Sequence, residues 1–218
     1  MFAKRLVRVS SLLAIALATV IATAVPASAH SGAANAKGTS SLAALLAKDG
    51  SGFDRNWNDY DIVDNAVSAV LAAKPTSPVA VLADGSVPLT AFLPTDRAFR
   101  RLAHDLTGKS YGSEAKVFGA LAGALDVGTI ENVLLYHVVP GAPITKKAAV
   151  NADGALLTTA QGGTVKVRVY SRYLPIIELR DRDTNDVNPF LNPRALDINA
   201  GNRQVAHGIV FVLRPLDL

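Results

Sequence analysis

Apolar residues recur at helical spacing through the first half of the chain and predict a series of helices there. The clearest pattern begins near Asp61, which can cap a helix, and continues until Pro75. Another helix is expected to begin at Thr95 or Asp96, either of which could be its cap. Three further helices are expected over residues 41–47, 114–125 and 129–137. Gly128 is expected to separate the last two.

Runs of β-branched residues predict strands in the second half of the chain and in two short segments of the first. In residues 164–170, three valines alternate with a lysine and an arginine, which indicates a strand with one buried and one exposed face. Residues 180–203 are rich in Asp, Asn and Pro and are expected to form an ordered loop with one short strand, 196–198. The other strands are expected over residues 79–82, 89–93, 155–159, 174–179 and 204–213. Helices first and strands later predict an α+β domain rather than alternating parallel units.

The first 29 residues have the three parts of a secretory signal peptide. A basic start is followed by an apolar run, Val9–Ala24, and by small residues in an A-x-A pattern, Pro26–Ala29. The apolar run has about 16 residues, whereas a membrane span needs about 20. We therefore expect cleavage after Ala29 and a secreted, extracellular chain without a membrane span. Residues 30–39 are expected to form a flexible lead, and residues 40–218 a single folded domain.

The charge balance argues against nucleic acid as a partner. The chain has 22 basic and 18 acidic residues, a formal net charge of +4. Three of the basic residues lie in the predicted signal peptide, and removing them from the 22 leaves 19 against 18. A nearly neutral chain has little general attraction to phosphate backbones or anionic lipid.

The familiar motifs of catalysis are missing from the sequence. There is no G-x-S-x-G elbow, no H-E-x-x-H, no glycine-rich phosphate loop and no dinucleotide fingerprint. The chain has no cysteine, which excludes disulfides, thiolate metal sites and a cysteine nucleophile. A catalytic triad could still assemble in space from scattered residues, because triads are defined by geometry. We nevertheless expect a protein that is not an enzyme and that needs no cofactor or metal.

Two segments have the spacing that opens a calcium loop. Asp181, Asp183 and Asn185 follow D-x-D-x-N, and residues 54–58 follow D-x-N-x-N. In both segments an Asp stands where the loop requires Gly, and the twelfth position is an Asn, which cannot supply a bidentate carboxylate. Because Asp and Asn also serve turns and caps, that interpretation is favoured over a metal site, although calcium binding at Asp181 stays open.

Three segments resemble the signature regions of the fasciclin (FAS1) family. They are the strand-to-helix segment LTAFLPTDRAF, the Tyr-His segment LLYHVVPG and the carboxyl-terminal segment VAHGIVFVL, at residues 89–99, 134–141 and 205–213. Each occurs once and in the family's order. The resemblance implies a single fasciclin domain, in which helices pack around a β-wedge or sandwich. It also implies a non-catalytic extracellular module for adhesion or interaction, which binds a cell-surface or matrix protein or a glycan.

The resemblance also points to four candidate partner-binding residues. Tyr136 and His137 correspond to a segment near an integrin-binding site in animal members, and Asp197 and Ile198 resemble an Asp-Ile pair before the last signature. On the other interpretation, Tyr136 packs in the core and His137 satisfies buried backbone groups at a helix end. The second interpretation is favoured for the Tyr-His pair, since buried polar side chains usually have internal partners.

Two other functional hypotheses remain open. Arg97, Arg100 and Arg101 cluster on a predicted helix, where they form either a solvated face or a site for an acidic polysaccharide. The chain could instead be a secreted small-molecule-binding protein or minor hydrolase, with a pocket between the helices and the sheet. That second hypothesis requires convergent polar groups in a cleft. The sequence leaves the oligomeric state open.

Overall fold

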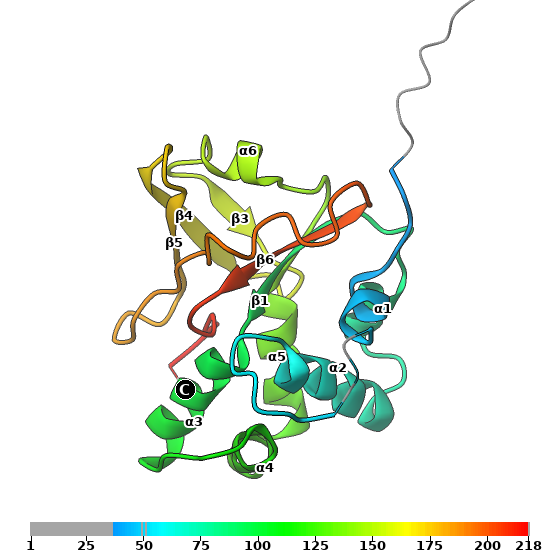
Figure 1. Cartoon of the computed structure of the whole chain (residues 1–218), viewed down its shortest axis with the longest axis vertical. Helices are drawn as coiled ribbons and strands as arrows, with labels where there is room; N and C mark the ends of the chain where they lie inside the picture. The colour runs from blue at the N-terminus through cyan, green and yellow to red at the C-terminus, as the bar shows by residue number, and fades with distance from the viewer. Residues whose placement is uncertain (1–36, 49, 51, 218) are drawn as a thin grey trace, which may run out of the picture. The chain divides into compact units, whose positions relative to one another are not determined.

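The computed structural model describes residues 37–48, 50 and 52–217 (Figure 1). The predicted signal peptide and all of the predicted flexible lead before Lys37 lie outside the described residues. The end of that lead is paired with the loop before the last strand. Gly38 donates its backbone N–H to the carbonyl of Gly201 at 2.9 Å, and its own carbonyl accepts from the N–H of Arg203 at 3.0 Å.

Five helices form one layer of the described part. They are α1 (Leu42–Leu46), α2 (Asp61–Ala73), α3 (Asp96–Thr107), α4 (Glu114–Ala124) and α5 (Val127–Tyr136). Their starts follow from local hydrogen bonds: the side chains of Ser41 and Asp126 accept from the third residue beyond them and cap α1 and α5. Gly108 ends α3 with a left-handed backbone, φ 67°, a conformation that glycine adopts without steric cost.

Six strands form two three-stranded sheets. The first sheet has the order β2 (Val138–Pro140), β1 (Leu89–Pro94), β6 (Gln204–Ile209), with β1 antiparallel to β2 and parallel to β6. The second is an antiparallel meander of β3 (Leu156–Thr158), β4 (Thr164–Ser171) and β5 (Ile176–Arg180). A short helix, α6 (Lys146–Ala149), lies between β2 and β3. The predicted α+β class is therefore confirmed.

The central strand β1 is buried on both faces. Leu89, Ala91 and Leu93 pack into the apolar cluster under the helices, whereas Phe92 packs into a second cluster with β4 and β5. In Figure 1, β1 and β6 run between the helices and the second sheet. Val165 and Val167 of β4 point into the second cluster and Lys166 is exposed, so the alternation predicted for this strand is confirmed.

Several predicted elements differ from the structure. The strand expected over residues 79–82 is wrong: the segment is a 3-10 helix, η1 (Pro78–Ala83), because Ser77 caps it and Pro78 stands at its start. Gly128 lies inside α5, and the break before that helix falls at Leu125 and Asp126 instead. The short strand expected at 196–198 is reduced to one bridge between Ile198 and Ala206.

None of the described helices is by itself long and apolar enough to cross a membrane. The helices α4 and α5 meet the length and composition requirements only as a pair, and the chain bends by 112° between them.

Tyr136 and His137 both lie in the core at the end of α5. The Tyr136 side chain is fully buried, and its hydroxyl donates to the carbonyl of Thr164 at 2.7 Å. Its ring also packs against Gly163, where a side chain would come within 2.8 Å of it. Tyr136 therefore joins the helical layer to β4.

His137 joins α5 to the end of the chain through both ring nitrogens. Nδ1 lies 2.7 Å from the carbonyl of Val133, and Nε2 lies 3.0 Å from the backbone N–H of Leu213. The Leu213 amide can only donate, so Nε2 must accept and Nδ1 must carry the proton. Burial lowers the pKa of His137 to about 4, and the hydrogen bond to Val133 opposes that shift. The folded state therefore requires a neutral ring.

Arg214 pins the carboxyl-terminal segment to the Asp-rich loop and to α3. The guanidinium is nearly buried, with 8% of its side chain exposed, and its nitrogens lie 2.7, 3.6 and 2.9 Å from carboxylate oxygens of Asp105, Asp183 and Asp186. The backbone N–H of Arg214 also donates to Asp181 at 2.9 Å. The Asp-rich loop, which has the spacing of a calcium loop, therefore contacts the guanidinium of Arg214, a cation that the protein itself supplies.

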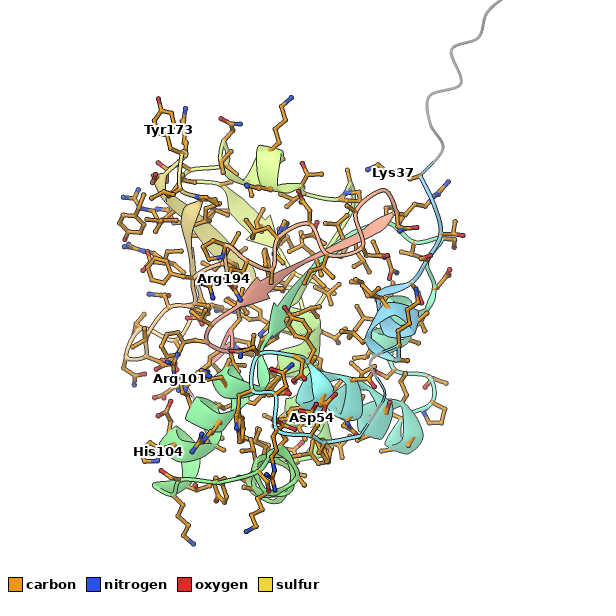
Figure 2. The ribbon with its side chains drawn as sticks, viewed as in Figure 1. Lys37, Asp54, Arg101, His104, Tyr173 and Arg194 are labelled. Atoms are coloured by element: carbon orange, nitrogen blue, oxygen red, sulfur yellow. The ribbon has the colours of Figure 1, made fainter. Side chains whose placement is uncertain are left out.

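The His137 geometry predicts that stability falls with acid. The unfolded His137 binds a proton near pH 6.5 and the folded one only near 4, so the unfolded state holds more protons between these values and stability rises with pH there. The loss on acidification should be on the order of 3 kcal/mol. Urea unfolding as a function of pH measures it. His137→Gln should flatten the slope of unfolding free energy against pH and cost about 1–3 kcal/mol of stability at neutral pH. His104 is exposed (Figure 2), and His104→Gln should leave that slope unchanged. An unchanged slope in His137→Gln contradicts the assignment.

Arg214→Met should destabilise the fold by about 3–5 kcal/mol, because it leaves the buried Asp183 carboxylate without a cation. Urea denaturation of the purified variant gives the free energy of unfolding. Arg168→Met is the matched control, since Arg168 is partly exposed and lies 3.9 Å from the exposed Asp153. That control should cost less than about 1 kcal/mol. Equal effects of the two substitutions would refute the role given to Arg214.

Candidate functional site

The four residues predicted to bind a partner fall into two different environments. Tyr136 and His137 are buried, with 0% and 5% of the residue exposed, and their polar atoms contact backbone groups of the core. Asp197 and Ile198 are half-buried and lie in the loop before β6. Only this second pair offers side-chain atoms to solvent. A direct contact through Tyr136 or His137 is excluded in the described conformation, and their geometry is that of the core interpretation.

Asp197 is held in a left-handed conformation by its neighbours. Its φ is 53°, its backbone N–H donates to Nδ1 of His207 at 3.3 Å, and its carboxylate accepts from the N–H of Lys146 at 2.6 Å. His207 is itself buried, and its Nε2 bonds to the carbonyl of Ile144 at 2.8 Å. Burial lowers the pKa of His207, which keeps the ring neutral and Nδ1 able to accept. The carboxyl-terminal signature histidine thus positions the Asp197 turn.

A surface hollow lies beside Ile198. Its volume is about 180 Å³, and residues of α1, α2 and the Asp197 turn line it. The lining is mixed, with aliphatic side chains of α1 and Ile198 on one side and Tyr60, Asp61 and Asp64 on the other. This hollow places Ile198 next to the start of α2, which the sequence alone could not show.

The tip of the β4–β5 hairpin carries the two most exposed apolar side chains of the described part. Tyr173 is 100% exposed and Leu174 70%, and the neighbouring Tyr170 is 57% exposed. Tyr173 and Leu174 lie in the turn between Ser171 and Ile176, and Figure 2 shows Tyr173 projecting from the end of the two strands. The strand expected from residue 174 begins only at Ile176, so Leu174 belongs to the turn and the sequence analysis missed this surface. Apolar residues at a hairpin turn, where Gly, Asn and Asp are usual, are the signal that could have found it.

Side-chain contacts and strand pairing support this hairpin below its tip. The hydroxyl of Tyr170 donates to Glu178 at 3.0 Å, Arg180 bonds to the same carboxylate at 2.8 Å, and the ring of Tyr170 lies 6.1 Å from that of Phe190. Four cross-strand pairs between β4 and β5 support the turn up to Val169, where the register shifts. The exposed tip is therefore presented by an ordered ladder.

The arginines of α3 are mostly engaged with aromatic rings. The guanidinium of Arg100 lies 4.7 Å from the ring of Trp57, and that of Arg101 lies 4.5 Å from the ring of Phe211. Arg101 also donates to the carbonyl of Val210 at 3.2 Å. Arg97, Arg100 and Arg101 line an open hollow together with His104, so a site for an acidic group is still geometrically available there.

The cavities near the two buried histidines are apolar and small. One of about 60 Å³ lies between the helices and β1 and touches His137; another of about 20 Å³ touches His207. Binding pockets for small molecules usually have about 300–1,000 Å³ and a few convergent polar groups. Both ring nitrogens of each histidine already bond to the backbone. These two cavities, as described, do not favour a carrier or a hydrolase.

Carboxylates gather where three helices begin, a feature that sequence reasoning missed. Asp59, Asp96 and Glu114 each place one oxygen within 4.8 Å of the others, and all three are buried. Each stands at or just before a helix start, so the sequence pattern indicated caps rather than a common site. Only the fold brings them together.

The chain was compared with solved structures and with curated proteins. Among solved structures, the chain is similar to a FAS1 domain pair from the insect cell adhesion molecule fasciclin I, with 15% sequence identity and a TM-score of 0.49. The match covers 70% of this chain and 47% of that chain, so this chain spans about half of the length of the solved pair. A comparison with curated proteins finds no match.

The family comparison covers most of the described domain. A model of the fasciclin domain matches residues 64–214, which is well over half of the 218 residues and takes in β1, the Tyr-His segment and β6. On this match, the chain belongs to the fasciclin family.

Proposed function

We propose that this fasciclin protein is a secreted, non-catalytic interaction module that binds a cell-surface or matrix protein through the tip of the β4–β5 hairpin. The observation that carries the proposal is the exposure of Tyr173 and Leu174 in the turn. Exposed apolar side chains that lie together, in contrast to scattered ones, mark interaction surfaces.

The chemistry of the tip suits a protein partner. Tyr and Arg are enriched among residues that dominate binding energy, and the turn holds Tyr173 next to Arg172. The supporting ladder of Tyr170, Glu178 and Arg180 holds the tip in place before binding. Such preorganisation lowers the entropy lost on association.

The Asp197 turn is the second surface of this proposal. Asp197 and Ile198 are partly exposed, and the hollow beside them accepts a side chain of a partner. In this proposal Tyr136 and His137 act indirectly, from the core. Tyr136 joins the end of α5 to β4, and His137 joins it to the carboxyl-terminal segment.

Export belongs to the proposal as well. It rests on the three-part signal pattern of residues 1–29 and on the extracellular setting in which an adhesion module works. Mass spectrometry of protein recovered outside the producing cells should find a chain that begins at His30. Recovery of the full chain inside the cells, with Met1 retained, would contradict export.

Binding should depend on the hairpin tip. The double variant Tyr173→Ser, Leu174→Ser should retain at least tenfold less cell-envelope or matrix protein than the unchanged chain, because hot-spot side chains contribute about 2 kcal/mol or more each. The measurement is a pull-down on the immobilised chain at low and high salt, followed by titration of the retained protein. An apolar contact should survive high salt, whereas retention lost in salt would indicate the arginines of α3 and an acidic polymer.

Three controls make this experiment decisive. Leu156→Ser removes another exposed leucine, near the other end of β4, and should bind normally. Asp197→Asn tests the second surface and keeps a residue type that tolerates its left-handed backbone. Protease treatment of the extract should abolish retention; retention that survives it indicates a glycan instead. Equal binding by the tip variant and the unchanged chain refutes the assignment to the hairpin.

A further inference from the structure

The starts of three helices converge on a group of buried carboxylates. Asp96 is the first residue of α3, Glu114 the first residue of α4, and Asp59 lies two residues before α2. One carboxylate oxygen from each lies within 4.8 Å of the others. Asp54 and Asp61 extend the group, since each also places an oxygen within 4.8 Å of Asp59. Figure 2 labels Asp54, which lies at the opposite end of the view from Tyr173.

Each of the three central side chains keeps one buried oxygen without a hydrogen-bond donor. Asp96 and Glu114 are 0% exposed and Asp59 is 9% exposed. One oxygen of Asp96 accepts from the N–H of Ile62 at 2.9 Å, and one oxygen of Glu114 accepts from the N–H of Asp54 at 2.7 Å. Oδ2 of Asp96, Oε1 of Glu114 and Oδ1 of Asp59 receive no hydrogen bond from an N–H or O–H donor of the described residues, and the side chains of Asp59 and Asp96 lie within hydrogen-bonding reach of each other. Buried carboxylate oxygens of this kind are rare unless a proton or a cation lies between them.

No cationic side chain in the described part forms an ion pair with Asp59, Asp96 or Glu114. The contrast with the other Asp-rich loop is informative, because there Arg214 enters among the carboxylates. Here the nearest compensation is the partial positive charge of the helix N-termini. The three carboxylates are therefore left without a full positive charge from any described side chain.

We propose that Asp59, Asp96 and Glu114 form a binding site for a divalent cation, and that this cation is calcium. The donor set is all oxygen, which hard cations prefer, and three carboxylates supply the charge that the site needs to bind one. Oxygens that share a calcium ion at about 2.3–2.6 Å lie within about 5 Å of one another, as these do. Magnesium dehydrates reluctantly and is seldom held by a site built from protein side chains alone, so calcium is the expected ion.

The segment before α2 places an exposed carboxylate beside this site. Asp54 is exposed, and its carboxylate accepts from the backbone of Asn56 in the turn that sequence analysis identified by its D-x-N-x-N spacing. The carbonyls of Trp57 and Asp59 accept from the N–H groups of Arg97 and Asp96 at 3.0 and 3.1 Å, which ties the segment to the start of α3. In this proposal the cation enters beside Asp54, the exposed member of the group, and its binding joins this segment to α3 and α4. The site is independent of the proposed hairpin contact.

Thermal unfolding of the purified chain, freed of metal with a chelator that is then removed, tests the site. At a calcium concentration about a hundred times the dissociation constant, Tm should rise by about 5–10 °C. Magnesium should raise it less, and sodium chloride of equal ionic strength should not raise it. A chain whose Tm is the same in calcium and in sodium chloride overturns the proposal, and the acid group then shares protons instead.

Two conservative variants locate the effect. Asp96→Asn and Glu114→Gln keep an oxygen for the N–H groups of Ile62 and Asp54 but remove a ligand charge, so each should lose the calcium-dependent rise. Asp153→Asn removes an exposed carboxylate elsewhere and should keep the full rise. A normal calcium response in both Asp96→Asn and Glu114→Gln overturns the proposal.

A measurement on the unaltered chain covers the case in which a variant does not fold. Trp57 is the one tryptophan of the sequence and lies in the segment that borders the site. Terbium, which substitutes for calcium at oxygen sites, should show emission sensitised by Trp57, and calcium should displace it at one ion per chain. Emission that calcium does not displace contradicts the assignment.

Discussion

The double burial of β1 is the constraint on which the rest of the domain depends. All six of its residues are buried, and its two faces belong to two different apolar clusters. Its backbone groups are out of reach of water and must pair, which β2 on one edge and β6 on the other achieve. Because β6 pairs with β1 in parallel, the chain from residue 95 to 203 must be in place before the sheet is complete. The helices α3 to α6, the second sheet and the Asp-rich loop all lie in that connection.

Sequence patterns predicted the secondary structure correctly where one face of an element is exposed to solvent. They failed where short-range hydrogen bonds determine the backbone conformation. The helix from Asp61 and the alternating strand around Val167 follow directly from amphipathic spacing. Residues 79–82 have the composition of a strand, yet the cap by Ser77 and the fixed φ of Pro78 favour a 3-10 turn, and no neighbouring strand competes for the segment. The bridge at Ile198 depends on the turn at Asp197, whose left-handed backbone is set by the distant His207 and Lys146.

The candidate sites show the same division between local and non-local information. The three signature segments located Tyr136, His137 and Asp197 in the chain, but burial decides which of them can meet a partner, and burial is a property of the assembled core. The exposed tip at Tyr173 could be suspected from apolar residues in a turn. The carboxylate group at Asp96 could not, because its members are far apart in sequence and each has an adequate local explanation at a helix start.

The two Asp-rich segments are subject to the same physical requirement and meet it in different ways. A buried carboxylate must receive a cation, a proton or enough N–H donors, since its charge is otherwise unsolvated. At Asp183 the cation is Arg214, supplied by the last segment of the family match. At Asp96 two N–H donors from other segments, those of Ile62 and Asp54, satisfy one oxygen each of Asp96 and Glu114 and leave the other oxygens without a donor. Since Asp96 lies two residues beyond the Pro94 end of β1, the strand that organises the core also fixes the position of this carboxylate, and the proposed cation would stabilise the start of α3.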